Sequence, residues 1–142
     1  MNKKYQRYID YIVSDIEAPY FKNMRDAYGL RPDEYELVLS KVYNEPVSIL
    51  ITIEGDRVYN TNDNQIYFED SNGDWKKREY DNNGNLIYQE NSNGGWYKYE
   101  YDDNGNIIYR EYNNGFWEKR EYDANGNLIY RENSDGHIED NR

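Results

Sequence analysis

The sequence predicts an α+β protein, in which a small N-terminal helical region is followed by an antiparallel β-meander of 21-residue hairpin repeats. Two observations support this class. The first 46 residues carry apolar side chains at helical spacing, whereas the rest carries Asn-Gly turn sequences between short alternating segments. We therefore expect a helical region over 1–46 and a repeat sheet over 47–142. The expected repeats lie near 57–74, 75–95, 96–116 and 117–137.

The helical region divides at its prolines and glycines. Side chains at helical spacing share one face over the first segment, namely Tyr5, Tyr8, Ile9, Ile12 and Ile16. Pro19 ends that segment, and a short helix over 21–28 would stop at Gly29. Pro32 suits the first position of a third helix. The β-branched run over 48–53 then predicts the first strand.

Aromatic and glycine residues then recur every 21 positions. The series are Trp75, Trp96 and Trp117; Tyr80, Tyr101 and Tyr122; and Gly84, Gly105 and Gly126. Each unit holds one turn of the form Asp-x-Asn-Gly-Asn, at 81–85, 102–106 and 123–127, and a second turn such as "SNGG". Asn and Gly tolerate the positive φ that hairpin turns need, so each unit is expected to form two antiparallel strands.

An odd repeat length constrains the turns, because side chains alternate between the faces of a strand. Equivalent residues keep one face only if one turn has an odd and the other an even number of residues. We expect a two-residue turn at 93–94 and a three-residue turn ending at Gly84.

This register predicts a tyrosine face that also receives the helices. That face would carry Tyr80, Tyr88, Tyr99, Tyr101, Tyr109, Tyr122 and Tyr130, together with Arg78 and Arg120. The opposite face would carry Lys77, Gln89, Lys98, Arg110, Lys119 and Arg131, with Glu79, Glu100 and Glu121 beside them.

Composition bounds the partners and the compartment. The 142 residues have a mean hydropathy of −1.26, 18 tyrosines, no cysteine and a net charge of −11. Such acidity favours basic partners, including nucleic-acid-binding proteins, and disfavours direct contact with nucleic acid or an anionic membrane. With no signal-peptide core and no apolar run of ~20 residues, we expect a cytoplasmic protein of a bacterial host, as a monomer or weak dimer.

The phrase "YDxNGNLIYxExSNGxW" resembles the tyrosine-aspartate repeats of Rhs-type proteins. The match lies at Tyr80-Asp81, Tyr101-Asp102 and Tyr122-Asp123, each followed by Gly-Asn three residues further on. The resemblance covers roughly residues 57–139 and implies stacked β-hairpins.

A helical head of the type "YIVSDIEAPYFKNMRDAYGLRPDEYELVLSKVYNEPV", joined to an acidic aromatic repeat, resembles phage-encoded anti-CRISPR proteins. That resemblance implies an inhibitor of a bacterial RNA-guided nuclease, with a type II effector as the expected target.

No motif for catalysis, a cofactor or a metal stands out, so we expect a non-enzymatic protein without either. The Asp-x-Asn-Gly-Asn turns are similar to calcium loops, but Gly84 is fourth from Asp81 and Ser92 stands at position twelve, where an EF-hand needs Glu. The single histidine, His137, has no His or Cys neighbour in the sequence.

The leading hypothesis is an acidic inhibitor that blocks the DNA-binding groove of an RNA-guided nuclease by mimicry of nucleic acid. Its predicted partner-binding residues are Asp70, Asp74, Asp81, Glu90, Asp102, Asp103, Glu111, Asp123, Glu132, Trp75, Trp96 and Trp117. Two alternatives remain open. The tryptophans resemble those of streptococcal wall-binding repeats, which implies a cell-wall or carbohydrate-binding module. The acidity also suits an immunity protein that neutralises a toxin.

Overall fold

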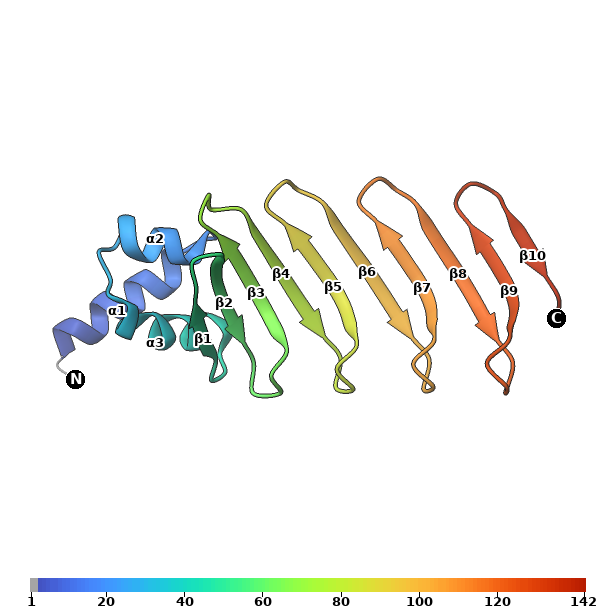
Figure 1. Ribbon diagram of the computed structural model, residues 1–142, viewed down its shortest axis with the longest axis horizontal. Helices are drawn as coiled ribbons and strands as arrows, with labels where there is room; N and C mark the ends of the chain where they lie inside the picture. Colours follow the sequence, from blue (N-terminus) through green and yellow to red (C-terminus); the bar gives the residue numbers. More distant parts are fainter. Residues whose placement is uncertain (1–2) are drawn as a thin grey trace. The chain divides into compact units, whose positions relative to one another are not determined.

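Three helices precede ten antiparallel strands that pair in chain order, from β1 to β10 (Figure 1). This arrangement, in a computed structural model that describes residues 3–142, confirms the predicted order of helices and β-meander. The chain divides into two compact units, Met1–Lys77 and Arg78–Arg142. We call them the helical unit and the hairpin unit.

The third helix begins at its expected residue, whereas the first ends at Asp15, before Pro19, and the second ends at Asp26, before the expected stop at Gly29. They are α1 (Lys3–Asp15), α2 (Tyr20–Asp26) and α3 (Pro32–Tyr43). Pro32 occupies the start of α3, where its missing N–H has no intrahelical partner to lose. Asn44 ends α3 in the left-handed conformation, with φ of 55°.

The strands are short and evenly placed. They are β1 (Ser48–Ile51), β2 (Gly55–Tyr59), β3 (Gln65–Asp70), β4 (Trp75–Tyr80), β5 (Leu86–Asn91), β6 (Trp96–Tyr101), β7 (Ile107–Tyr112), β8 (Trp117–Tyr122), β9 (Leu128–Asn133) and β10 (Ile138–Asp140). Strands β4, β6 and β8, each of which follows a turn of the second type, begin at Trp75, Trp96 and Trp117.

The buried apolar residues all belong to the helical unit. Those of residues 3–142 are Ile9, Ile12, Tyr20, Phe21, Met24, Leu30, Tyr35, Val38, Leu39, Val47, Val58, Ile66 and Tyr67. Figure 1 shows the helices beside β1–β3, and aromatic contacts join the two layers. The ring centroid of Tyr67 lies 4.9 Å from that of Tyr20 and 6.0 Å from that of Phe21.

One buried carboxylate joins α2 to the sheet. Glu69, 1% exposed, accepts the backbone N–H of Phe21 at 3.0 Å and that of Lys22 at 2.8 Å. The Tyr67 hydroxyl donates to the same carboxylate at 2.6 Å and accepts the N–H of Tyr20 at 3.0 Å. Glu69 thus satisfies N–H groups in the first turn of α2, which have no partner within the helix.

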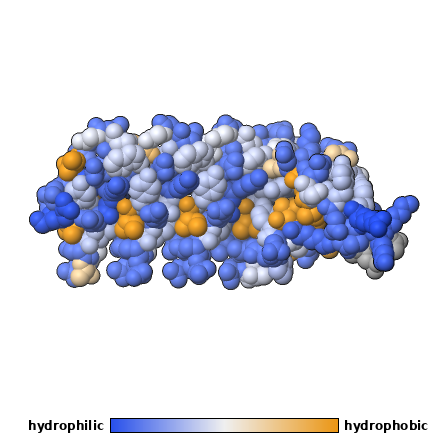
Figure 2. Space-filling model, turned by 180° about the vertical axis from the view of Figure 1, so that it is seen from behind, coloured by the Kyte–Doolittle hydropathy of each residue, from blue (hydrophilic) through white to orange (hydrophobic). Residues whose placement is uncertain are grey.

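The hairpin unit, by contrast, has no core of buried apolar side chains within the described chain. Only Gln89 and Glu118 are buried there. In the space-filling view, hydrophobic atoms over this unit form separate spots among hydrophilic ones (Figure 2). Ladder hydrogen bonds and contacts along the strands therefore hold this unit together, and the faces of its sheet remain accessible in part.

The predicted turn lengths are wrong for one of the two turns. The turn at 91–95 has three residues between its paired ends, because Asn91 N–H bonds Gly95 O at 2.8 Å and Gly94 N–H bonds Asn91 O at 3.0 Å. The turn at 81–85 has the same pattern, and Gly84 and Gly94 share φ values of 84° and 89°. Two turns of equal length cannot satisfy the parity condition.

A β-bulge supplies the missing odd residue. Glu100 pairs with Tyr109 and Tyr101 with Ile107, so the ladder skips Ile108. The same shift occurs between Glu121 and Tyr122 on β8, opposite β9. The extra residue shifts the alternation of side chains by one. The residues beyond the bulge therefore point to the opposite face of the sheet from the one they would otherwise occupy.

The bulge therefore corrects the predicted faces of the sheet. The ladder places one set of side chains on what we call the front face: Gln89, Tyr97, Tyr99, Tyr101, Arg110, Tyr112, Glu118, Arg120, Tyr122 and Arg131. The back face carries Tyr88, Glu90, Trp96, Lys98, Glu100, Tyr109, Glu111, Trp117, Lys119, Glu121, Tyr130 and Glu132. Compared with the prediction, Tyr88, Tyr109 and Tyr130 exchange places with Gln89, Arg110 and Arg131.

The same correction applies to the surface that receives the helices. Tyr67 contacts the helices and pairs across the ladder with Lys77, which was expected on the face opposite to them. The Lys77 ammonium lies 5.2 Å from the ring centroid of Tyr20 on α2. The helices therefore lie against a face that combines Tyr67, Glu69 and Lys77.

Substitution of Glu69 by Gln should destabilise the helical unit. The amide retains one acceptor oxygen and cannot receive both N–H groups of α2 and the Tyr67 hydroxyl. Loss of a charged, buried acceptor predicts a decrease of about 1–3 kcal/mol in the free energy of unfolding. Urea denaturation followed by circular dichroism measures it.

The matched control is Glu36→Gln, the same change at an exposed position of α3. We expect this variant to unfold within about 0.5 kcal/mol of the wild type. Equal stability of the Glu69 variant and this control would contradict the assigned role of Glu69.

Candidate functional site

The Asp-x-Asn-Gly-Asn turns present three carboxylates in equivalent conformations. In each, the first Asp accepts the backbone N–H groups two and four residues further on, at 2.9 Å, in the turns that begin at Asp81, Asp102 and Asp123. The side-chain amide of the last Asn also donates to that Asp, at 3.1–3.3 Å. The turns therefore fix the direction of each of these partly exposed carboxylates.

These hydrogen bonds favour the charged form of the carboxyl groups. The backbone N–H of Asn85, Asn106 or Asn127 is the largest cause, and it lowers the pKa of Asp81, Asp102 and Asp123 below the ordinary value of 3.8. The three turns join β4 to β5, β6 to β7 and β8 to β9, so they lie at one end of the strands (Figure 1). This end of the hairpin unit carries fixed negative charge at neutral pH.

The back face repeats a Trp–Lys–Glu column on alternate strands. The Lys98 ammonium lies 5.0 Å from the ring centroid of Trp96, and that of Lys119 lies 5.3 Å from Trp117. Glu90 and Glu111 pair across the ladder with Trp96 and Trp117. In strands β5–β9 this face carries five glutamates, Glu90, Glu100, Glu111, Glu121 and Glu132, against Lys98 and Lys119.

Two equivalent hollows lie along this repeat. One, of about 480 Å³, is lined by Glu79, Asp81, Ile87, Tyr88, Lys98, Tyr99, Glu100 and Tyr101. The other, of about 490 Å³, is lined by Glu100, Asp102, Ile108, Tyr109, Lys119, Arg120, Glu121, Tyr122 and Tyr130. Eight positions of the second lie 21 residues after positions of the first, and Arg120 replaces Tyr99 at one of them. The repeat therefore offers the same acidic and aromatic surroundings twice.

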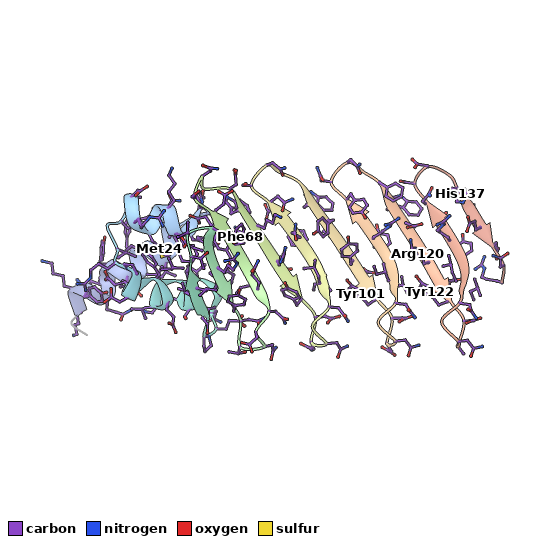
Figure 3. The ribbon with its side chains drawn as sticks, in the orientation of Figure 1. Met24, Phe68, Tyr101, Arg120, Tyr122 and His137 are labelled. Atoms are coloured by element: carbon purple, nitrogen blue, oxygen red, sulfur yellow. The ribbon has the colours of Figure 1, made fainter. Side chains whose placement is uncertain are left out.

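The front face has the opposite charge. Glu118, 2% exposed, lies 2.6 Å from Arg110, 3.1 Å from Arg120 and 3.5 Å from Arg131. Arg120 and Arg131 pair directly across the ladder, where like charges repel, and the shared carboxylate offsets that repulsion. Figure 3 shows Arg120 and Tyr122 on β8 and Tyr101 on the neighbouring hairpin.

Aromatic rings adjoin this arginine cluster. Tyr97, Tyr99 and Tyr101 contact one another in sequence along β6, with ring centroids 5.3 and 6.4 Å apart. Tyr112 contacts Tyr97 at 6.2 Å and stacks on Phe116 at 5.9 Å, with 17° between the ring planes. Tyrosine and arginine are the side chains enriched at protein interaction surfaces.

The structure distributes the predicted partner-binding residues over separate places. Asp81, Asp102, Asp103 and Asp123 lie in the turns at one end of the hairpin unit. Glu90, Glu111, Glu132, Trp96 and Trp117 lie on its back face. Asp70, Asp74 and Trp75 belong to the helical unit, where Asp70 accepts the N–H groups of Asn72 and Asp74. The predicted partner-binding residues therefore do not form one continuous surface, and only the first group lies in the Asp-x-Asn-Gly-Asn turns.

Sequence reasoning did not assign the arginine cluster. It placed Arg110 and Arg131 on the face opposite to Arg120, because it had no bulge. One signal was available: Glu118 stands where the preceding repeat has Tyr97, and it is the departure around which the arginines gather.

Over residues 3–142, no group of three His, Cys, Asp or Glu side chains is arranged to hold a metal ion. Nor is any helix within that range both long and apolar enough to cross a membrane.

The turn carboxylates should titrate below the ordinary pKa of Asp. Because their pKa is lower in the folded than in the unfolded protein, they stabilise the fold above the unfolded pKa, and this contribution is lost as the pH falls through the folded pKa. Carboxyl NMR titration should place Asp81, Asp102 and Asp123 below 3.8. Asp102→Asn, which keeps one acceptor oxygen, should reduce the loss of stability in acid. A titration at the ordinary value would contradict the assignment.

Replacement of Glu118 by Gln should destabilise the hairpin unit by about 1–3 kcal/mol, because three guanidinium groups lose one charged acceptor. Glu100→Gln, an exposed change on the back face, serves as the control and should stay within about 0.5 kcal/mol of the wild type. Urea unfolding of both variants provides the measurement. Equal midpoints would show that Glu118 does not hold the cluster together.

Comparison with known proteins identifies no family for this chain. No protein-family model matches it, and no curated protein matches it.

Proposed function

We propose that this chain is a non-enzymatic binding protein, whose acidic turns and back face engage a basic surface on a nucleic-acid-binding protein. The finer proposal is an anti-CRISPR-like inhibitor that occupies the DNA-binding groove of an RNA-guided nuclease. The type II effectors are the first partners to test.

The observation that carries the proposal is the row of fixed carboxylates at Asp81, Asp102 and Asp123. Each is partly exposed, is oriented by its own turn, and has a pKa lowered by N–H donors. A preorganised charge loses less conformational freedom on binding than a flexible side chain does. These carboxylates therefore suit recognition of a cationic surface.

The repeat supports mimicry of a polyanion by its spacing. Taking the 21-residue hairpin as the unit, equivalent turns are two strands apart, or about 9.6 Å at a strand separation of ~4.8 Å. Phosphates along a nucleic acid strand recur on a scale of several Å. The five glutamates of the back face add charge beside this row. A groove lined with Lys and Arg could pair with several of these groups at once.

The carbohydrate-binding alternative gains no support from the tryptophans. A lysine ammonium lies 4.9, 5.0 and 5.3 Å from the ring centroids of Trp75, Trp96 and Trp117. These lysines occupy positions that a choline cation would need on that side of each ring. An immunity protein against a nuclease toxin would use the same acidic surfaces, so identification of the partner distinguishes it.

Affinity capture from a bacterial lysate, with and without an added nuclease–guide complex, tests the proposal. The nuclease should be retained, and its association rate should fall steeply with added salt. The variant Asp81→Asn, Asp102→Asn, Asp123→Asn should bind more slowly and with a weaker salt dependence, since Asn preserves the turns and removes the charge.

A control of equal charge change lies in the helical unit: Asp26→Asn, Glu36→Gln, Glu45→Gln, all at exposed positions. It should bind like the wild type. Salt-independent association, or equal losses in both triple variants, would refute recognition by the turn carboxylates. Retention of a secreted toxin in place of the nuclease would favour the immunity function.

A further inference from the structure

The front face of the hairpin unit contains a cationic cluster that the acidic surfaces do not explain. Arg110 and Arg120 each place a terminal nitrogen within 3.1 Å of the same Glu118 oxygen, so their guanidinium groups converge. Arg131 joins them, but it also donates to Glu139 at 2.7 Å. Glu118 is buried, whereas the side chains of Arg110 and Arg120 are 31% and 26% exposed. The two arginines therefore present net positive charge to solvent.

Donors remain for a ligand at this cluster. A guanidinium group has five N–H donors. Arg110 uses one terminal nitrogen for Glu118 and the other for the Tyr112 hydroxyl, at 3.3 Å. Arg120 uses one terminal nitrogen for Glu118 and also interacts with the Tyr122 side chain. The Nε–H groups of both arginines are buried, so the donors left for a ligand are on terminal nitrogens. Converging guanidinium groups with spare N–H donors fit the oxygens of a phosphate group, which they bind in planar, paired geometry.

An aromatic platform and a hollow lie next to Arg110. Its guanidinium carbon is 5.9 Å from the ring centroid of Tyr112 and 5.7 Å from that of Phe116. These two stacked rings line a hollow of about 590 Å³ with Asn114, Gly115, Ser134 and Asp135. The hollow joins a flat apolar surface to a carboxylate acceptor, which suits a planar ring that carries an amino group.

We infer that this part of the front face binds a nucleotide unit, with its phosphate on Arg110 and Arg120 and its base in the hollow against Tyr112 and Phe116. Asp135 accepts the exocyclic amino group of the base. The same chemistry occurs in a free nucleotide and in a single-stranded nucleic acid. From the net charge of −11 we expected no contact with nucleic acid. The acidic groups that dominate this charge in the hairpin unit lie on the back face and in the turns, whereas the front face is positively charged.

The preceding repeat lacks two residues of the site, so the site is present at the turn at 112–116 and absent from the turn at 91–95. Phe116 stands where the earlier copy has Gly95, and Glu118 stands where it has Tyr97. The aromatic platform and the buried acceptor of the cluster are therefore both departures from the repeat. The preceding copy forms its strands without them, so these two departures support the inference.

NMR titration of the labelled full chain at low salt tests the site with three probes: inorganic phosphate, AMP and a short single-stranded oligonucleotide. Saturable amide shifts should appear in β7–β9 and in the turn at 112–116. The double variant Arg110→Gln, Arg120→Gln should weaken AMP binding by at least about ten-fold. Lys98→Gln, Lys119→Gln, with the same charge change on the back face, should retain it.

A second variant keeps the cluster intact and removes the platform. Phe116→Gly, which restores the residue of the preceding repeat, should abolish the preference for AMP over phosphate while phosphate binding persists. Stronger binding of the oligonucleotide than of AMP would assign the site to a nucleic acid strand, and the reverse to a free nucleotide. Absence of saturable shifts with every probe, or equal losses in the arginine and lysine variants, would overturn the inference. All of these measurements use the chain alone with a small probe, so their outcome is independent of whether the chain binds a nuclease.

Discussion

The alternation of side chains along a strand is the constraint on which the hairpin unit depends. In a repeat of odd length, one residue must fall outside the alternation of side chains. Otherwise equivalent residues of successive copies would point to opposite faces of the sheet. Both turns have three residues and a left-handed glycine, so the turns cannot absorb it. The bulge that skips Ile108 does so, and the same shift between Glu121 and Tyr122 preserves the arrangement in the next copy. Every assignment of a residue to the front or back face follows from this one position.

The two units achieve order by different means. In the helical unit, Glu69 replaces the missing partners at the start of α2, and the surrounding rings exclude water from Tyr67. In the hairpin unit, Glu118 and Gln89 are the only buried side chains of the described residues, and both are polar. Contacts along the sheet replace a core there: Arg78 donates to Gln89 at 2.9 Å, and Tyr97 contacts Tyr112. Such a sheet leaves side chains of both faces available for partners.

The order of elements could be predicted because local residues specify it. Pro32 places the start of α3, and Asn-Gly sequences place the turns regardless of what the strands contact. The turn Asp residues were found for the same reason. The register could not be predicted, because Ile107 and Ile108 are both good strand residues and nothing local distinguishes the bulge. The arginine cluster depends on that register, and the contact between Tyr67, Lys77 and α2 depends on tertiary packing.

The separation of charge in the hairpin unit bears on what kind of partner it fits. Solubility alone does not account for the gathering of Arg110, Arg120 and Arg131 around one buried carboxylate, which also stabilises the sheet. A protein surface can present side chains of both signs, and a nucleoprotein presents basic side chains and phosphates within a short distance. The turn carboxylates match the basic side chains and the arginine cluster matches the phosphates. Under the two proposals made above, the oppositely charged surfaces of the hairpin unit would both find partners on a nucleoprotein.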